Sequence, residues 1–395
     1  MKTAGIVAEF NPFHNGHAAL IHAAREGGAT HVAAVMSGNF CQRGSLAVTD
    51  KRIRTRCALL GGVDLVLELP LPWATATAQR FGAGAVALLA GTGCVDMLCF
   101  GSECGDTAAL EQAAGAVDDP ALRAPLAQGL EQGLTFARAR QLAVGSVAGP
   151  QAARLLAHPN NALAVEYLRG ARQIGWRPEL FTIARRGAAH DAPQPEGAFA
   201  SASHLRTIAL DFSALARFMP APCAALLEDA HSRGLYAADP AKLETAVLAR
   251  LRCLAPGALR ELPDLSEGLE NRLYNAIRTA ASLEELYALA KTKRYTLARI
   301  RRLVLHAFLG VTARDIQQSP PYLRILGFNG AGREILSRML PSLPADTRLA
   351  RLRERGDACR RLAELEERAT DLYTLALPRP RPCGYELRAG GVYIK

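Results

Sequence analysis

Five short, almost uninterrupted apolar runs alternate with helical segments in the first 210 residues of this 395-residue chain. The runs lie at residues 3–8, 31–36, 64–70, 95–103 and 179–184. A strand that is apolar on both faces is typical of a parallel sheet that helices cover on both sides. The sequence therefore predicts an α/β fold built on a Rossmann-like parallel sheet.

The pattern changes near residue 210. Segments rich in Leu, Ala, Arg and Glu, with helical spacing of their apolar residues, replace the strand-like runs at 221–234, 240–254, 267–290, 294–309 and 356–375. We therefore expect two domains, 1–210 and 211–395, the second mainly helical. The tail from Pro378 begins extended, and we expect it to end in a small hairpin turned at Gly390 and Gly391.

The positive charge is unevenly distributed along the chain. Residues 1–210 hold 18 Lys and Arg against 16 Asp and Glu, whereas residues 211–395 hold 29 against 21, so most of the net charge of +10 lies in the second half. A polyanionic partner bound to the second half explains this excess. A general Arg-rich bias of the composition explains it equally well.

Composition excludes several classes of protein. With 49% apolar and 21% charged residues, the chain has a globular composition. No apolar run is long enough to cross a bilayer, and the first residues lack a secretory apolar stretch, so we expect a cytoplasmic protein with no membrane partner. The nine cysteines include no CxxC pair, and no Cys/His spacing suits zinc. We therefore expect free thiols and no resident metal.

The strongest local signal follows the first predicted strand directly. Residues 11–13 (NPF) end the strand, and residues 14–17 (HNGH) open the next helix. His14 and His17 can face one side there, beside backbone N–H groups that carry partial positive charge. This strand–HxGH–helix arrangement resembles the adenylyl-transferring superfamily, in which such histidines stabilise negative charge on an α-phosphate. The alternative interpretation is that both histidines only cap the helix.

A partner motif for phosphate binding lies at residues 200–206 (ASASHLR). Ser201 and Ser203 stand where a helix is expected to begin, and Arg206 follows about one turn later. Hydroxyl groups at a helix start and a nearby guanidinium can hold the β- and γ-phosphates of a nucleotide. An ordinary serine cap with a solvated arginine is the alternative, but the pairing with residues 14–17 favours phosphate binding.

Loops after two other strands are further candidates for ligand binding, because ligands of α/β sheets bind at the carboxyl ends of the strands. The loop 37–44 (SGNFCQRG) offers four side chains for a small carboxylate: Ser37, Asn39, Phe40 and Gln42. Lys51 lies just beyond this loop, and we expect it to reach phosphate and to act with the two histidines and Arg206 in catalysis. Gly101 lets a nucleotide lie on the backbone. A plain loop is the alternative for each.

A basic segment runs from Lys291 to His306 (KTKRYTLARIRRLVLH). Its apolar residues recur at helical spacing, which predicts a helix with one packed face and one basic face. The basic face suits phosphate contacts with a nucleic acid, and Tyr295 is expected to stack on a base. A solvated basic helix is the alternative. The candidate RNA-binding residues are Lys291, Lys293, Arg294, Arg299, Arg301 and Arg302.

Eight segments occur along the chain in the order GIVAEFNPFHNGH, SGNFCQRG, DLVLELP, FGSE, PNNALAVEY, ASASHLR, RYTLARIRR and PYLRILGFNGAGRE. Together they resemble the bacterial tRNA(Met) cytidine acetate ligase family. The match runs from residue 3 to about residue 340, and the tail beyond it carries no motif of this kind.

The resemblance implies that ATP activates acetate, forming acetyl-adenylate and pyrophosphate. The acetyl group then passes to N4 of the wobble cytidine (C34) of elongator tRNA(Met), and AMP leaves. The implied partners are ATP with Mg²⁺, acetate and elongator tRNA(Met), with no role for DNA. A small-molecule or cofactor adenylyltransferase is the alternative, as is a non-catalytic tRNA-binding protein. The intact His14, His17 and Arg206 argue against a decayed nucleotide site.

Position by position, the resemblance places ATP against one segment near the N-terminus and several separate residues. The segment comprises Val7, Ala8, Glu9, Phe10, Asn11, Pro12, Phe13, His14, Asn15, Gly16, His17, Ala18, Ala19 and Leu20. The separate residues are Gly101, Asn160 or Asn161, Arg185, Arg186, Ser201 and Ser203. Arg186 departs from the family pattern, which has an apolar residue at this position.

Overall fold

The central sheet has the strand order β10-β8-β5-β2-β1-β6-β7, with β9 beside β8. The computed structural model describes residues 1–184, 197–266 and 268–395. The strands of this sheet are β1 (Thr3–Ala8), β2 (His31–Ser37), β5 (Leu65–Leu69), β6 (Met97–Ser102), β7 (Glu179–Ala184), β8 (Leu323–Phe328), β9 (Ala345–Asp346) and β10 (Val392–Tyr393). The five strands predicted from the apolar runs are thereby confirmed, and all five run parallel.

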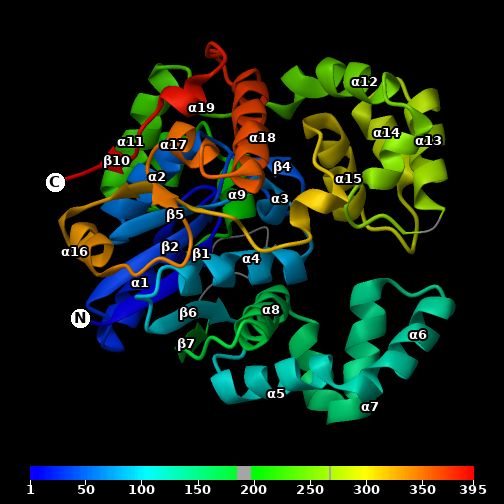
Figure 1. Cartoon of the computed structure of the whole chain (residues 1–395), viewed down its shortest axis with the longest axis horizontal. Helices are drawn as coiled ribbons and strands as arrows, with labels where there is room; N and C mark the ends of the chain where they lie inside the picture. The colour runs from blue at the N-terminus through cyan, green and yellow to red at the C-terminus, as the bar shows by residue number, and fades with distance from the viewer. Residues whose placement is uncertain (185–196, 267) are drawn as a thin grey trace.

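Helices cover both faces of the sheet. The helices between its first strands are α1 (Asn15–Glu26), α2 (Lys51–Leu60), α3 (Leu71–Ala74), α4 (Ala78–Gly91) and α8 (Pro159–Gln173). Figure 1 shows α4 and α8 together on one side of the sheet, and α1 and α2 belong to the other, as right-handed crossovers require. A small hairpin, β3 (Phe40–Cys41) and β4 (Ser45–Leu46), follows β2.

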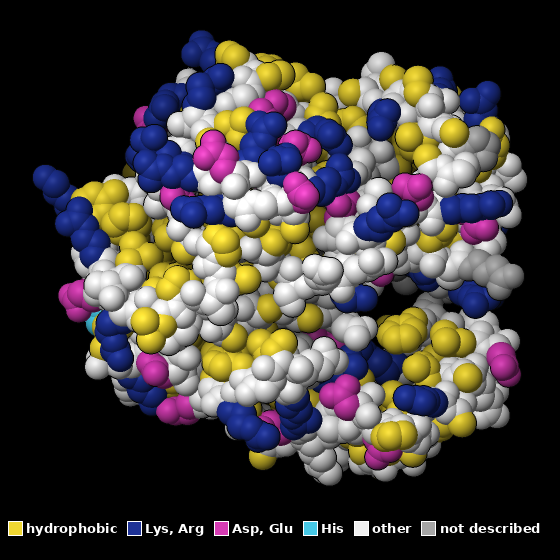
Figure 2. All heavy atoms as spheres, viewed as in Figure 1, with side chains coloured by type: hydrophobic (Ala, Val, Ile, Leu, Met, Phe, Trp, Pro, Cys, Tyr) yellow, Lys and Arg dark blue, Asp and Glu magenta, His cyan; other side chains and the backbone are white. Residues whose placement is uncertain are grey.

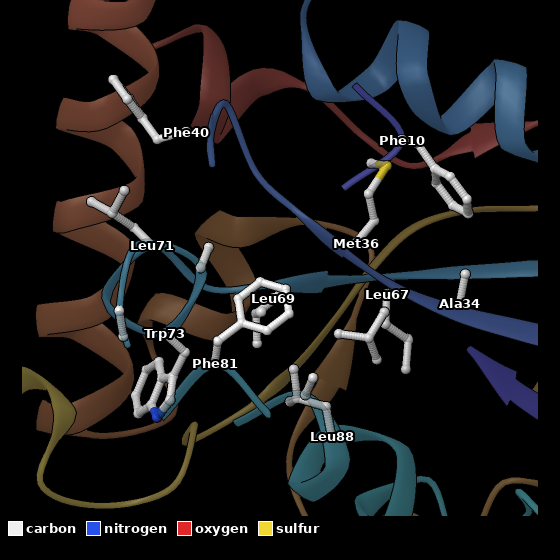
Figure 3. Packing of buried hydrophobic residues seen from close by; sticks show 14 of the residues in the cluster. Phe10, Ala34, Met36, Phe40, Leu67, Leu69, Leu71, Trp73, Phe81 and Leu88 are labelled. Carbon is white, nitrogen blue, oxygen red and sulfur yellow. The ribbon is translucent and has the colours of Figure 1, made fainter. Parts of the chain in front are cut away.

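The core fills both sides of the central strands. Figure 3 shows Phe10 and Met36 on one side of the sheet, with Leu67, Phe81 and Leu88 on the other. All five side chains are buried. Strands that are buried on both faces explain why the sequence shows uninterrupted apolar runs instead of an alternation with polar residues.

Three strands from the second half of the chain, β8, β9 and β10, join the same sheet, so the expectation that strands end near residue 210 is wrong. β8 pairs antiparallel with β5, and β10 pairs parallel with β8. The expected hairpin at Gly390 and Gly391 is also wrong, because β10 returns to the main sheet. β8 carries a fully buried arginine, Arg324, and this charged residue conceals a buried strand from an apolar pattern. The division of the chain into domains at residue 210 stays a prediction.

The other long elements are helices, and several of them form two lobes beside the sheet (Figure 1). One lobe contains α5 (Thr107–Asp118), α6 (Arg123–Glu131) and α7 (Phe136–Leu156). The other contains α12 (Glu244–Arg252), α13 (Leu269–Thr279), α14 (Leu283–Ala290) and α15 (Leu297–Leu309). The remaining helices are α9 (Ala202–Thr207), α10 (Phe212–Leu215), α11 (Ala221–Ser232), α16 (Gly330–Arg338), α17 (Leu349–Arg353), α18 (Asp357–Thr374) and α19 (Tyr385–Arg388).

All nine cysteines are free thiols, as expected, and five of them are buried. Among the described residues, no helix is both long enough and apolar enough to cross a membrane.

Candidate active site

His14 and His17 lie stacked at the start of α1, with ring centroids 3.7 Å apart and 23° between the ring planes. His14 Nδ1 accepts a hydrogen bond from the backbone N–H of Gly16 at 3.1 Å, and His17 Nδ1 accepts one from the backbone N–H of His14 at 3.2 Å. The capping interpretation is therefore correct for the Nδ1 atoms. Because each Nδ1 accepts, the neutral rings carry their protons on Nε2, which makes both Nε2 atoms hydrogen-bond donors.

The residues around this pair fix its position. Phe10 is fully buried, and its ring meets the His17 ring edge-on at 4.9 Å. Phe13 lies 5.5 Å from the same ring. Gly16 leaves room for the His14 ring, since a Cβ at this position would lie 2.9 Å from His14 Cε1. The sequence around the two histidines thus specifies the orientation of both imidazoles.

The serine–arginine segment meets the histidine turn, as the pairing of the two motifs predicts. Arg206 donates a hydrogen bond to the carbonyl of Asn11 at 2.9 Å and another to Ser203 Oγ at 3.1 Å. The Asn15 side chain donates to the carbonyl of Ala198 at 2.9 Å. Ser201 is buried and accepts from the backbone of His204, so it is an ordinary helix cap. Arg206 is exposed but tethered beside the two histidines.

Glu103, two residues after Gly101, connects the end of β6 with Asn160 and Asn161 at the start of α8. The Glu103 carboxylate accepts hydrogen bonds from the backbone N–H groups of Asn160 and Asn161 and from the Asn160 side chain. Burial opposes ionisation of Glu103, but these hydrogen bonds outweigh it and lower its pKa. Asn161 is buried and accepts from the backbone of Glu103, so its side chain serves the turn after β6.

Sequence reasoning did not identify Glu103 as the anchor of α8. An acid directly after a strand, with two asparagines at a later helix start, is the signal that could have found it. Arg185 and Arg186 directly follow β7, but they lie outside the described residues. Since β1, β2, β6 and β7 run parallel, their carboxyl ends share one edge of the sheet with the histidine turn.

The loop 37–44 turns its polar groups mainly toward the protein. Ser37 is fully buried. The Asn39 side chain donates to Thr370 Oγ1 at 3.3 Å and accepts from the backbone of Lys51 at 2.9 Å. Gln42 donates its backbone N–H to Glu9 Oε1 at 2.8 Å. The structure therefore gives the Asn39 side chain a role in the fold of the loop. The carboxylate contacts of Ser37 and Gln42 stay predictions.

Lys51 does not reach a phosphate site, because its side chain is fully buried in an ion cluster. Its Nζ lies 2.8 Å from Glu386 Oε1 and 3.4 Å from Glu366 Oε2, and it also donates to Glu68. Burial opposes its charge, but the three carboxylates outweigh burial and raise the pKa of Lys51. The buried ion cluster consists of Lys51, Arg52, Glu68, Arg324, Glu366 and Glu386. This finding corrects the catalytic prediction for Lys51.

A cavity of about 1040 Å³ lies next to the histidine turn. Phe40, residues 44–46, Val48 and Arg206 line it from the first half of the chain, and residues of α12, α14 and α15 line it from the second half. Gly44 has a φ of +73°, and a Cβ there would lie 2.8 Å from the backbone of Arg301. The loop and α15 are therefore in direct contact at one wall of the cavity.

The basic segment divides into exposed and engaged side chains. Lys291, Lys293, Arg294 and Arg301 are exposed. Arg299 donates to the carbonyl of Asp264 at 3.1 Å, and Arg302 lies 3.8 Å from the carboxylate of Asp264. Burial lowers the pKa of both of these arginines.

The predicted stacking role of Tyr295 is wrong, because its ring is buried and lies beneath the guanidinium groups of Arg299 at 5.3 Å and Arg294 at 5.9 Å. Figure 2 shows Lys and Arg side chains bordering the hollow between the two helical lobes. Within the described parts of the chain, no cluster of three or more His, Cys, Asp or Glu side chains could hold a metal ion.

Comparisons with known proteins agree with this architecture. The family model described as HIGH Nucleotidyl Transferase matches residues 1–385. A tRNA(Met) cytidine acetate ligase of Thermoanaerobacter sp. (strain X514) is 37% identical over 386 residues, covering 95% of this chain and 96% of that protein. One of Acetivibrio thermocellus is 36% identical over 410 residues, covering 98% of each.

Solved structures give the same result. The crystal structure of Thermotoga maritima TmcAL (apo) is 32% identical, covers 100% of both chains and has a TM-score of 0.94. The structure of Thermotoga maritima TmcAL bound with alpha-thio ATP is also 32% identical, again covers 100% of both chains and has a TM-score of 0.92. The resemblance seen in the eight segments is confirmed, and the chain belongs to the tRNA(Met) cytidine acetate ligase family of HIGH nucleotidyltransferases.

Proposed function

We propose that this ligase activates acetate with ATP and transfers the acetyl group to N4 of the wobble cytidine of elongator tRNA(Met). The observation that carries the proposal is the stacked His14–His17 pair with Arg206 tethered beside it. The names of the relatives supply tRNA(Met) and acetate, and the neighbour bound with alpha-thio ATP supports ATP as the nucleotide. We assign activation to residues 1–210 and RNA binding to residues 211–395.

In the first step, an acetate oxygen attacks the α-phosphorus of ATP, and the bond from that phosphorus to pyrophosphate breaks. Negative charge increases on the α-phosphate oxygens in the transition state. Donors aimed at such charge are worth more there than in the ground state. The Nε2–H groups of His14 and His17 are the donors we assign to this charge. Arg206 is assigned to the departing pyrophosphate, which a guanidinium binds through charge-assisted hydrogen bonds.

In the second step, the cytidine N4 amine attacks the acetyl carbonyl carbon. The bond from that carbon to the AMP oxygen breaks, AMP leaves, and the amine loses a proton. A cytidine amine is a weak nucleophile, so positioning is expected to supply much of the rate. The base must leave its stack in the anticodon loop, which costs little in a loop. We expect Mg²⁺ to enter on the phosphates of ATP.

The remaining ATP contacts belong to the same proposal. Residues 7–20 surround the nucleotide, Gly101 supports it on the backbone, and Asn160 contributes from the start of α8. The tight anchoring of α8 by Glu103 supports this placement, because it fixes the start of α8 beside the end of β6. The proposed contacts of Arg185 and Arg186 lie outside the described residues.

The experiment that tests the function is mass spectrometry of nucleosides from unfractionated tRNA incubated with the protein, ATP and isotope-labelled acetate. The expected product is labelled N4-acetylcytidine, confined to elongator tRNA(Met). Pyrophosphate release without any labelled nucleoside would instead favour a small-molecule adenylyltransferase. Label in another base would contradict the assigned acceptor.

Phe40 is the member of the loop 37–44 that we retain for acid selection, because its ring lines the cavity that Arg206 also lines. Replacing Phe40 with Ala should improve propionate relative to acetate in pyrophosphate release. The shift should lie between about tenfold and 200-fold, since an apolar pocket distinguishes one methylene by about 1–3 kcal/mol. Phe136→Ala, at an exposed phenylalanine of α7, is the matched control. An unchanged acetate-to-propionate ratio would remove Phe40 from the acid site.

A further inference from the structure

The cavity beside the histidine turn is far larger than acetate requires. Its volume of about 1040 Å³ is slightly above the range of about 300–1,000 Å³ typical for pockets of drug-sized ligands, whereas acetate has only four heavy atoms. We propose that this cavity is the acceptor site and takes one extruded pyrimidine nucleotide of an RNA, with the base inside and its phosphate on Arg301. This inference rests on the proposed function and adds the place where the acceptor binds.

The interior of the cavity suits a nucleobase. Val304, Leu305 and Phe308 line it from α15, and Leu243 and Val247 line it from the α12 side. A base that leaves its stack exposes two apolar faces, and proteins bind such bases between aromatic and aliphatic side chains. The apolar walls therefore replace the stacking that the nucleotide loses in the RNA.

Arg301 differs from the neighbouring arginines of α15. Arg299 and Arg302 are half-buried and engaged with Asp264, whereas Arg301 is exposed and lines the cavity. Its guanidinium lies 5.6 Å above the ring of Tyr287, another lining residue. This contact holds the charge at the cavity wall without neutralising it. A phosphate bound there receives a guanidinium whose position is already restricted.

The cavity adjoins the proposed site of activation at Arg206. Arg206 lines it and also binds the carbonyl of Asn11 at 2.9 Å, three residues before His14. A base inside the cavity therefore approaches the place where acetyl-adenylate would form. The exposed Lys291, Lys293 and Arg294 lie on the same lobe and offer contacts to the flanking phosphates.

The test uses two substitutions with matched controls. Ala241→Trp places a bulky ring at an exposed lining residue, and Arg301→Ala removes the phosphate ligand. Ala225→Trp and Arg250→Ala make the same changes at exposed positions that do not line the cavity. Steady-state acetylation of elongator tRNA(Met) gives the KM values for tRNA, ATP and acetate. Circular dichroism shows whether each variant is folded.

We expect each cavity variant to lower kcat/KM for tRNA by about tenfold or more, while the KM values for ATP and acetate stay within about twofold. Cavity variants that match their controls would overturn the acceptor site. A loss confined to the KM for acetate would also overturn it, by assigning the whole cavity to the acid. If the wild-type protein forms no acetylcytidine at all, the proposed function fails first and the acceptor site falls with it.

Discussion

At the residue scale, the two ring nitrogens of each histidine have different roles, one in the fold and one in the proposed chemistry. The Nδ1 atoms of His14 and His17 cap α1, and the Nε2 atoms are the donors assigned to the α-phosphate. An asparagine side chain also caps helices well, but it has no group that reaches the Nε2 position.

His14→Asn and His17→Asn should therefore keep the thermal midpoint near that of the wild type. Each should lower acetate-dependent pyrophosphate release by roughly 10²–10³, the usual loss for one donor to a developing charge. His22→Asn, at an exposed histidine of the same helix, is the control. Wild-type release rates in both asparagine variants would show that the histidines only cap the helix.

A second prediction at this scale concerns Glu366 in the buried ion cluster. Burial and the neighbouring Glu68 raise the pKa of Glu366 to about 8. A carboxyl whose folded pKa exceeds its unfolded value stabilises the fold at low pH and loses this contribution as pH rises through the folded pKa. Glu366 should therefore contribute less stability at pH 8 than at pH 5.

Urea unfolding at several pH values checks this prediction. The stability of Glu366→Gln relative to the wild type should rise between about pH 5 and pH 8, because the amide cannot ionise. Glu354→Gln, at an exposed glutamate, should show no such trend. A pH-independent difference for Glu366→Gln would contradict the raised pKa.

At the element scale, the basic segment is predicted to act through its exposed members alone. Neutralising Lys291, Lys293, Arg294 and Arg301 together should weaken tRNA binding and flatten its salt dependence, because fewer counterions are released. The matched variant Arg299→Ala with Arg302→Ala should instead lower stability, since both side chains are engaged with Asp264. Filter binding of tRNA at several salt concentrations distinguishes the four-residue variant from the Arg299/Arg302 double variant. Equal salt slopes in the first variant and the wild type would show a merely solvated surface.

The same scale shows what the sequence could predict. The strands β1, β2, β5, β6 and β7 were predictable because burial on both faces requires continuous apolar runs. β8 was not, because Arg324 interrupts its apolar pattern and is accommodated by ion pairs with Glu68 and Glu386. The contact between the histidine and arginine motifs could be predicted from their places around one sheet. The burial of Lys51 could not be predicted, since its partner Glu366 lies more than 300 residues away.

At the scale of the whole molecule, the chain end completes the first part of the fold. Glu386 is fully buried and lies 2.8 Å from Lys51 Nζ, 3.0 Å from an Arg52 nitrogen and 2.5 Å from an Arg324 nitrogen. Removing residues 384–395 should destabilise the protein by at least about 3–5 kcal/mol, the typical cost of leaving a buried charge unpaired. Since domains have only about 5–15 kcal/mol of stability, much of the truncated protein should be unfolded.

Soluble yield and urea unfolding of the truncated chain measure this loss. Removing Lys395 alone should leave both unchanged, because this residue is exposed. Glu386→Gln in the full-length chain removes the carboxylate but keeps β10, so it separates the contribution of the carboxylate to stability from that of the strand. A truncated chain as stable as the wild type would show that the cluster tolerates the loss of the Glu386 carboxylate.

The return of β10 and Glu386 to the sheet has a consequence for biosynthesis. The ribosome delivers residues from the N-terminus at about 5–20 per second, so the histidine turn emerges long before its supporting cluster can close. We expect the sheet and its buried ion cluster to stay incomplete until residue 386 leaves the exit tunnel. A transcript broken near its end would then yield a product that contains both histidines and Arg206. Because this product cannot complete its fold, we expect proteases to degrade it.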